Sequence, residues 1–399
     1  MRILITITGC PPSVGGAQIY THYLARHLSE QGHTVHMATH WDETRHDWLM
    51  GTTLRAPTED KTYVVDGVPI YRLGLSRSQK ARLLPAAVSY YALQGWAINQ
   101  IAAILLEKLH TLGTNWDVVH NVRMGREGLS FASQQFAREM DVPFVLSPLH
   151  HPRWSGWLHR HYHRLYRSAD AVIALTNAER ETLSQLGVPP ERITVTGIGP
   201  VLSDKADGGQ FRAVYGLQEH PIVLFLGQHY AYKGIEALVE AAPQVWSAHP
   251  NAQFVFVGPP TPSSGALFEK HVDPRIHRLG TVDLQTKTDA LAACDLLCVP
   301  SSQESFGGVY VEAWTMGKPV IGGSAPAIQN VITQGKDGFT VDQNPGMIAK
   351  HIIALLSDHT LRQQMGKAGQ RKVTERYSWE KLAALTLASY SVDTSKNPV

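Results

Sequence analysis

Short runs of apolar, often β-branched residues alternate with helical patterns along the whole chain. The predicted strands of the first half are Arg2–Ile7, Thr34–Thr39, Val118–Asn121, Phe144–Leu149 and Ala171–Leu175. A second series comprises Ile222–Leu226, Phe254–Val257, Ile276–Leu279, Leu296–Val299 and Pro319–Ile321. Segments such as Gln18–Gln31, with apolar residues at helical spacing, lie between the strands. This alternation is typical of parallel sheets with helices on both faces.

The two series are separated near residues 197–209 by a stretch rich in Gly, Asp and Ser that has no periodicity. The chain has 399 residues, which exceeds the size at which one hydrophobic core keeps growing. We therefore predict an α/β chain of two Rossmann-like, doubly wound domains, residues 1–198 and 199–376, that face a cleft. Ligands of such sheets bind beyond the carboxyl ends of the strands, so the site is expected in that cleft.

Bulk composition excludes several classes of protein. A net charge of +2 gives no indication of nucleic-acid binding. Cys10, Cys294 and Cys298 are too few for a disulfide framework, and we expect them to be small buried side chains in a reducing compartment. The apolar run at the N-terminus is too short for a signal peptide and is expected to form a strand at once.

One stretch, Ala86–Leu106, is apolar enough to be considered as a membrane span. It contains Gln94, Asn99 and Gln100, which favour a buried or groove-lining helix instead. We therefore expect a soluble, cytoplasmic protein, and a peripheral contact with the inner membrane face stays open as an addition to this prediction.

The first loop, Gly9-Cys-Pro-Pro-Ser-Val-Gly-Gly-Ala, joins a strand to a helix that begins near Gln18. Gly15 and Gly16 would let the backbone approach a ligand, with free amides at the helix start facing an anion or a sugar hydroxyl. The spacing is neither that of a dinucleotide fingerprint nor that of a P-loop. Alone, a paired-glycine turn is equally well explained as turn chemistry.

A second loop follows the strand Ile222–Leu226 and leads to Lys233-Gly234, which are expected to open the next helix. A lysine at this place can reach a diphosphate in the cleft and neutralise the charge that develops as the diphosphate leaves. A solvated surface lysine is the alternative interpretation of this motif taken alone.

The third loop carries the most specific pattern, Pro300-Ser-Ser-Gln-Glu304-Ser-Phe-Gly-Gly-Val-Tyr-Val-Glu312. A helix is expected to start near Gly307 or Gly308, and its unpaired first amides suit a diphosphate. Glu304 can accept hydrogen bonds from sugar hydroxyls. Glu312 lies on an otherwise apolar helix face, where an acid without partners is costly, and is placed to bind ribose hydroxyls. Capping or salt-bridging acids are the alternative.

Taken together and in this order, these residues resemble the large glycosyltransferase family 4, whose members have the GT-B fold and retain the anomeric configuration of the sugar. The resemblance covers nearly the whole chain. Its motifs, in chain order, are Gly15-Gly16, Lys233-Gly234, Val257-Gly258-Pro259, Gly280-Thr281-Val282, the Glu-x7-Glu of Glu304 and Glu312, Gly317-Lys-Pro-Val-Ile, and Tyr377-Ser-Trp379-Glu. The last motif looks like the final helix of the family, so residues 377–399 are expected to cross back onto the first domain.

The resemblance implies a donor site for a nucleotide-diphosphate sugar. Its expected members are Gly15, Gly16, Gln228, Lys233, Gly258, Val282, Glu304, Ser305, Phe306, Gly307, Gly308 and Glu312. By resemblance, Lys233, Gly16 and the amides of Ser305–Gly308 contact the phosphates, whereas Gly258 and the backbone near Val282 lie along the nucleotide. Glu304 holds the donor sugar and Glu312 the ribose.

Two positions depart from the family's pattern. Gln228 stands where many relatives have an arginine beside the lysine, so one positive charge is missing, for which His229 or Arg153 is a candidate substitute. In Ala325-Pro-Ala-Ile-Gln329, Ala and Gln replace a Gly and a Glu common in relatives. These changes bear on donor affinity and on the identity of the sugar.

His150 and His151 follow the strand Phe144–Leu149 at its carboxyl end. In relatives a histidine near this point contacts the donor sugar and helps to place the acceptor, so the expected catalytic set is Glu304, Lys233, His151 and His150, with His151 favoured over His150.

The following segment, Trp154–Arg167, is rich in His, Arg and Trp. It is either a solvated helix face with anchored aromatic residues or a contact for anionic lipid headgroups. His159 and His163 have the spacing of a zinc pair but no third ligand nearby, so no metal site is predicted.

We therefore predict a retaining hexosyltransferase that moves a sugar from a UDP- or GDP-sugar to a hydroxyl of a glycan, a lipid-linked or a small-molecule acceptor. Because the chain contains no Asp-x-Asp, the enzyme is expected to be independent of metal and of other cofactors. Two alternatives remain: a non-catalytic sugar-nucleotide-binding subunit, and a related GT-B epimerase or phosphorylase.

Overall fold

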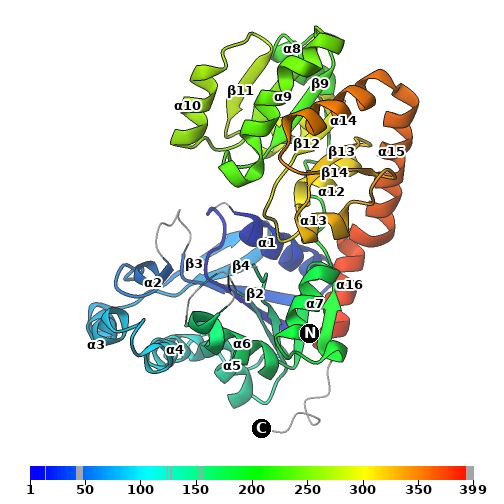
Figure 1. Cartoon of the computed structure of the whole chain (residues 1–399). Helices are drawn as coiled ribbons and strands as arrows, with labels where there is room; N and C mark the ends of the chain where they lie inside the picture. The colour runs from blue at the N-terminus through cyan, green and yellow to red at the C-terminus, as the bar shows by residue number, and fades with distance from the viewer. Residues whose placement is uncertain are drawn as a thin grey trace. The chain divides into compact units, whose positions relative to one another are not determined.

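The computed structural model describes residues 1–13, 15–41, 48–123, 125, 128–151, 154 and 156–391. The chain divides into two compact units (Figure 1). The first unit contains residues 1–196 and the segment from Trp379 onward, and the second contains Gly197–Ser378. The chain thus enters the second unit inside the Gly- and Asp-rich stretch and returns just after Tyr377-Ser378. Each unit is a sheet with helices on its faces.

The first unit is built on an eight-stranded sheet with the order β3-β4-β2-β1-β5-β6-β7-β8. Its strands are β1 (Arg2–Ile7), β2 (Thr34–Thr39), β3 (Lys61–Val65), β4 (Val68–Arg72), β5 (Val118–Val122), β6 (Phe144–Ser147), β7 (Ala171–Ala174) and β8 (Ile193–Val195). All neighbours pair in parallel except β3 and β4, which form an antiparallel hairpin. Its helices are α1 (Gly16–Glu30), α2 (Trp48–Gly51), α3 (Arg77–Val88), α4 (Gln94–His110), α5 (Leu129–Glu139), α6 (Arg160–Ser168), α7 (Asn177–Gln185) and α16 (Trp379–Tyr390), with short 3-10 turns η2 (Trp157–His159) and η3 (Pro190–Arg192).

The second unit has a six-stranded sheet with the order β11-β10-β9-β12-β13-β14, and every pair is parallel. Its strands are β9 (Ile222–Leu226), β10 (Gln253–Val257), β11 (Ile276–Gly280), β12 (Leu296–Val299), β13 (Val320–Gly323) and β14 (Gly338–Val341). Its helices are α8 (Gly208–Val214), α9 (Ile235–Ala248), α10 (Pro262–Lys270), α11 (Leu284–Ala293), α12 (Gly308–Thr315), α13 (Pro326–Val331), α14 (Pro345–Ser357) and α15 (His359–Lys372), with the 3-10 turn η4 (Ala231–Lys233) and the π-helical turn η5 (Val373–Tyr377).

Burial explains why these segments form strands. In β5, β6, β9, β10 and β12 every residue is buried, as expected for parallel strands covered on both faces. The three cysteines are free and buried, which confirms the prediction of small buried side chains. Helix α16 packs against α1, β7 and β8, so the end of the chain belongs to the first core.

The prediction of one helix over Ala86–Leu106 is wrong. Helix α3 ends at Val88 and α4 begins at Gln94. Local hydrogen bonds close the turn between them: Ser89 Oγ donates to the carbonyl of Pro85 (2.8 Å), and the N–H of Leu93 donates to the carbonyl of Ser89 (2.8 Å). Among the residues described, no helix has the length and apolarity needed to cross a bilayer.

Candidate functional site

The predicted donor residues of the second unit lie on loops that follow four neighbouring strands. Gln228 and Lys233 follow β9, Gly258 follows β10, Val282 follows β11, and Glu304–Gly308 follow β12. Because these strands are parallel, the four loops share one edge of the sheet. The chain winds outward in one direction through β10 and β11 and in the other from β12. The loops after β9 and β12 therefore flank the topological switch point, where open α/β sheets bind ligands.

Lys233 and Glu304, 71 residues apart, form an ion pair between Nζ and Oε1. Their side chains are only 18% and 14% exposed. The loops that carry them are joined by the backbone, since the N–H of Ser302 donates to the carbonyl of Tyr232 (2.8 Å). Gln343, after β14, adds a hydrogen bond from Nε2 to the same carbonyl (2.8 Å). The two predicted charges thus meet and neutralise each other.

Lys233 ends the turn η4 and does not open a helix as predicted, because Gly234 adopts a left-handed conformation (φ 78°) and α9 begins at Ile235. Gln228 is exposed. His229 is buried between Phe225 and Phe268, and burial lowers its pKa. Burial therefore disfavours a charged imidazole, which argues against His229 as the substitute for the missing arginine charge. The other candidate, Arg153, lies outside the described residues.

The glycine turn before α12 has a backbone that only glycine adopts readily. Gly307 is the N-cap residue with φ 88°, and a Cβ added there would lie 2.3 Å from the Tyr310 ring. No side chain caps the helix, so its first amides keep their capacity to bind an anion. Phe306, which is buried, packs edge-on against Tyr377 (5.3 Å between ring centres) and fixes the loop.

Glu312, one turn into α12, is 7% exposed. Its Oε1 accepts a hydrogen bond from Lys287 Nζ on α11 (2.8 Å), and the same ammonium donates to the carbonyl of Val201 (2.6 Å). Oε2 has no partner. Burial raises the pKa of Glu312, and Lys287 opposes that rise. One carboxylate oxygen is thus held by the protein and the other remains available. Sequence reasoning missed Lys287, because it belongs to no motif.

The first unit contributes the paired glycines after β1. Gly15 is the N-cap of α1 and Gly16 its first residue. Gly16 is exposed, and a Cβ added there would meet nothing within 4 Å. Packing within the chain therefore does not require a glycine at 16. This open space at a helix start is consistent with a ligand approaching the backbone.

The two histidines follow β6. His150 is 6% exposed, and its pKa is lowered to about 4 chiefly by burial and then by Arg123. Its backbone N–H donates to Glu179 Oε1 (2.5 Å), and its ring Nδ1 has no partner among the residues that the structure describes. His151 is half-buried, and its ring lies 6.2 Å from that of Trp154. The preference for His151 over His150 stays a prediction. No group of three His, Cys, Asp or Glu side chains suited to a metal ion occurs within the described part of the chain.

Sequence reasoning also missed Arg123 and Glu179. Arg123 directly follows β5, beside the switch point between β1 and β5, and is fully buried. Its guanidinium lies over the rings of Trp154 (4.4 Å) and Tyr162 (4.2 Å), while Nε and Nη2 have no hydrogen-bond partner within the described part of the chain. Glu179 Oε2 accepts the N–H of Leu175 (2.8 Å), so its carboxylate ties the histidine turn to β7. A polar residue directly after an apolar run was the available signal for Arg123.

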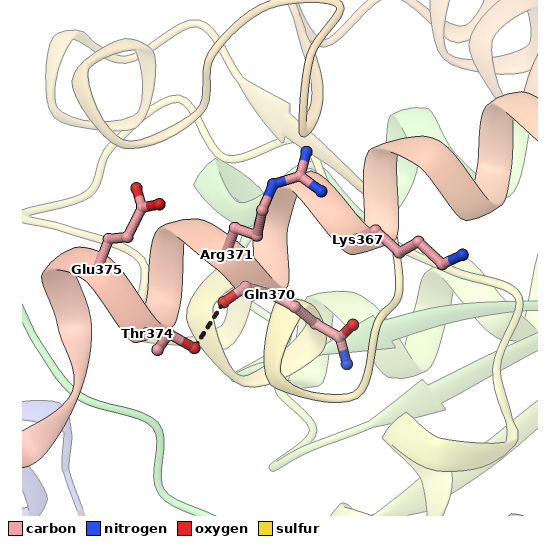
Figure 2. A pocket seen from close by; sticks show the side chains of 5 residues that line it. All are labelled: Lys367, Gln370, Arg371, Thr374 and Glu375. Atoms are coloured by element: carbon pink, nitrogen blue, oxygen red, sulfur yellow. Dashed lines mark hydrogen bonds between the residues drawn. The ribbon is translucent and has the colours of Figure 1, made fainter.

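A surface hollow of about 340 Å³ lies elsewhere in the second unit. Its lining residues lie on α15 and on the turn η5 that follows it (Figure 2): Lys367, Gln370, Arg371, Thr374 and Glu375. Thr374 Oγ1 donates to the carbonyl of Gln370 (3.2 Å). None of the predicted site residues lines this hollow, and its charged residues are two basic side chains and one acid. It is therefore not the candidate site.

Comparison with known proteins identifies the family. Residues 15–199 match the family profile described as "glycosyl transferase 4-like domain", and residues 220–358 match "glycosyl transferases group 1". The chain belongs to glycosyltransferase family 4. It is an enzyme that transfers a sugar, and the predicted α/β fold with two Rossmann-like domains is confirmed.

Individual relatives agree with this assignment. This glycosyltransferase is 26% identical to an uncharacterized glycosyltransferase of Methanocaldococcus jannaschii over 98% of each chain. It is 26% identical to the alpha-D-kanosaminyltransferase of Streptomyces kanamyceticus over 77% of this chain and 87% of that one. Its fold matches HepE of Anabaena, solved in complex with UDP and glucose, with a TM-score of 0.73, 18% identity and coverage of 98% and 99%.

Proposed function

We propose that this glycosyltransferase takes its sugar from a UDP- or GDP-sugar and transfers it with retention of configuration to an acceptor hydroxyl. The observation that carries the proposal is the meeting of Lys233, Glu304 and the uncapped start of α12 at the switch point of the second sheet. The complex of HepE with UDP and glucose supports a nucleotide-sugar donor for a chain of this fold.

In this proposal the donor diphosphate replaces the Glu304 carboxylate as the ion-pair partner of Lys233. A diphosphate at the start of α12 competes with the Glu304 carboxylate for the ammonium and gains the first amides of the helix in addition. Glu304 is then free to accept hydrogen bonds from hydroxyls of the donor sugar. Stabilisation of the leaving diphosphate by Lys233 and these amides supplies the largest catalytic contribution.

Glu312 is proposed to bind the ribose. Lys287 holds Oε1, so the unpartnered Oε2 is the oxygen that accepts from ribose hydroxyls. Gly258 and Val282, on the loops after β10 and β11, are proposed to lie along the nucleotide. Ser305, Phe306, Gly307 and Gly308 complete the phosphate-binding turn, with Gln228 beside it.

Retention requires the acceptor to attack from the face that the diphosphate leaves. The acceptor hydroxyl then passes its proton to the departing phosphate, and no protein side chain is assigned as a nucleophile. Metal independence is part of the proposal, because the chain has no Asp-x-Asp to clamp a metal-bound diphosphate.

The acceptor is assigned to the first unit and the donor to the second, Gly197–Ser378. Gly15, Gly16, His150 and His151 follow strands of the first sheet at its carboxyl edge. A neutral His150 offers an unpartnered Nδ1 as a hydrogen-bonding group at this edge. The acceptor class remains a glycan, a lipid-linked or a small molecule.

The decisive experiment is incubation with a panel of UDP- and GDP-sugars, with and without acceptors, while nucleoside diphosphate release is measured. One donor consumed with acceptor-dependent release supports the proposal. If a sugar nucleotide raises the melting temperature but is not consumed in the presence of any acceptor tested, the protein is a sugar-nucleotide-binding subunit instead.

A further inference from the structure

Helices α3 and α4 pack against each other in the first unit (Figure 1). Several large apolar side chains on and near the turn between them are exposed. We name this the α3–α4 apolar surface, and its residues are Leu84, Val88, Tyr91, Leu93, Trp96 and Trp157. Val88 is 78% exposed and Trp157 64%. Single exposed apolar residues need no explanation, but two tryptophans and a tyrosine among three aliphatic residues do.

Hydrogen bonds show that this surface is continuous across segments distant in sequence. Gln94, the first residue of α4, donates from Nε2 to the carbonyl of Leu158 (2.8 Å) and accepts at Oε1 from Arg160 (3.1 Å). These bonds hold η2, with Trp157, against the start of α4. The Tyr90 and Tyr162 hydroxyls, 3.0 Å apart, join the α3–α4 turn to α6 beneath it. The surface is therefore held by its own buried polar contacts.

Near the turn between α3 and α4 the sequence carries basic residues and no acids, and Glu107, toward the other end of α4, is paired with Arg82. The sequence has no Asp or Glu between Asp66 and Glu107, and none between Asp141 and Asp170, and these are the two stretches that meet at Gln94. Arg160 stacks over the Trp157 ring (3.4 Å). Arg164, on α6 beneath the turn, is exposed. Apolar residues with interfacial aromatics and surrounding arginines are the pattern of a surface that lies on an anionic bilayer.

We propose that the α3–α4 apolar surface binds the face of a membrane that contains anionic lipids. A second copy of the chain fits less well, since a two-fold contact would bring the same arginines face to face. The chain lies on the membrane in this inference, and none of its described helices crosses it. The proposal goes beyond the donor site and stands whether or not the donor assignment holds.

The test is co-sedimentation of the full chain with vesicles of phosphatidylcholine and phosphatidylglycerol, compared with phosphatidylcholine alone. Val88→Asp places a negative charge in the surface. Val272→Asp, in the second unit, is the matched control because Val272 is 87% exposed and lies outside the surface. We expect the wild type and Val272→Asp to bind the anionic vesicles alike. Val88→Asp is expected to bind about tenfold more weakly, and added salt to weaken all binding.

Equal vesicle binding by the two variants, or no binding by the wild type, would overturn the proposal. So would self-association of the wild type that Val88→Asp abolishes in the absence of vesicles, since a second copy would then cover the surface. UDP-induced thermal shift, measured on the same variants, keeps the two proposals apart. A normal UDP-induced shift in Val88→Asp shows that the substitution has changed only membrane binding. The absence of a UDP-induced shift in the wild type and in both variants would contradict the proposed donor site but not the membrane proposal.

Discussion

Removing the ammonium that pairs with Glu312 tests how the donor edge is held together. Lys287→Met keeps the aliphatic stem but leaves the carboxylate of Glu312, whose side chain is 9% exposed, without its partner. Breaking a buried ion pair from one side costs about 3–5 kcal/mol, and we expect about 3 kcal/mol here because Lys287 itself is 19% exposed. Protonation relieves an unpaired carboxylate, so the loss is expected to shrink as pH falls.

A double-mutant cycle by urea unfolding, followed by circular dichroism, measures this coupling. Glu312→Gln removes the charge, so Lys287→Met/Glu312→Gln should recover about 2 kcal/mol of the loss seen in Lys287→Met. UDP affinity should fall in Lys287→Met as well, since Oε1 is no longer held. Additive effects of the two substitutions at both pH 7 and pH 5 would refute the reasoning, because they would mean that the pair contributes nothing as a pair.

Three further predictions follow from the glycines and the buried histidine. Gly16→Val should leave the melting temperature unchanged but weaken UDP-sugar turnover, measured as KM and kcat, because the added side chain occupies the open space at the start of α1 to which the proposal assigns a ligand. Gly307→Ala should lower the free energy of unfolding by about 1–3 kcal/mol, as determined by urea titration, whereas Gly216→Ala, also at positive φ but in open space, should cost clearly less. His150 stays neutral to about pH 4 in the folded chain but takes a proton below pH 6.5 when unfolded, so it should reduce stability by up to about 3 kcal/mol as pH falls through that window, and His150→Gln should flatten the profile of melting temperature against pH.

The central strands were predictable because most of them are local apolar runs buried on both faces, whereas β8 and β14 were not predicted. Since parallel strands share their carboxyl edge, the same pattern predicts that the loops carrying Lys233 and Glu304 lie close together. It does not predict that the two side chains form an ion pair. The hairpin of β3 and β4 was missed even though Asp66-Gly67 is a typical two-residue turn between strands. Its strands are only half-buried and therefore lack a continuous apolar run.

The sequence could not predict side-chain contacts that depend on how the helices and strands pack against one another. Lys287 reaches Glu312 because α11 packs against α12, and no spacing rule connects the two residues. The burial of His229 likewise depends on Phe225 and Phe268 around it. The apolar stretch Ala86–Leu106 was predicted to form one continuous helix, whereas hydrogen bonds of Ser89 and Leu93 close a turn within it.

The most direct test of the central claim is nucleoside diphosphate release by the wild type and by Lys233→Ala, on the donor that the panel selects. The account predicts acceptor-dependent release by the wild type. It predicts a loss of at least about 100-fold in kcat in Lys233→Ala, because the ammonium acts on charge that develops as the diphosphate leaves. Full activity of Lys233→Ala, in a protein that remains folded, would contradict the account.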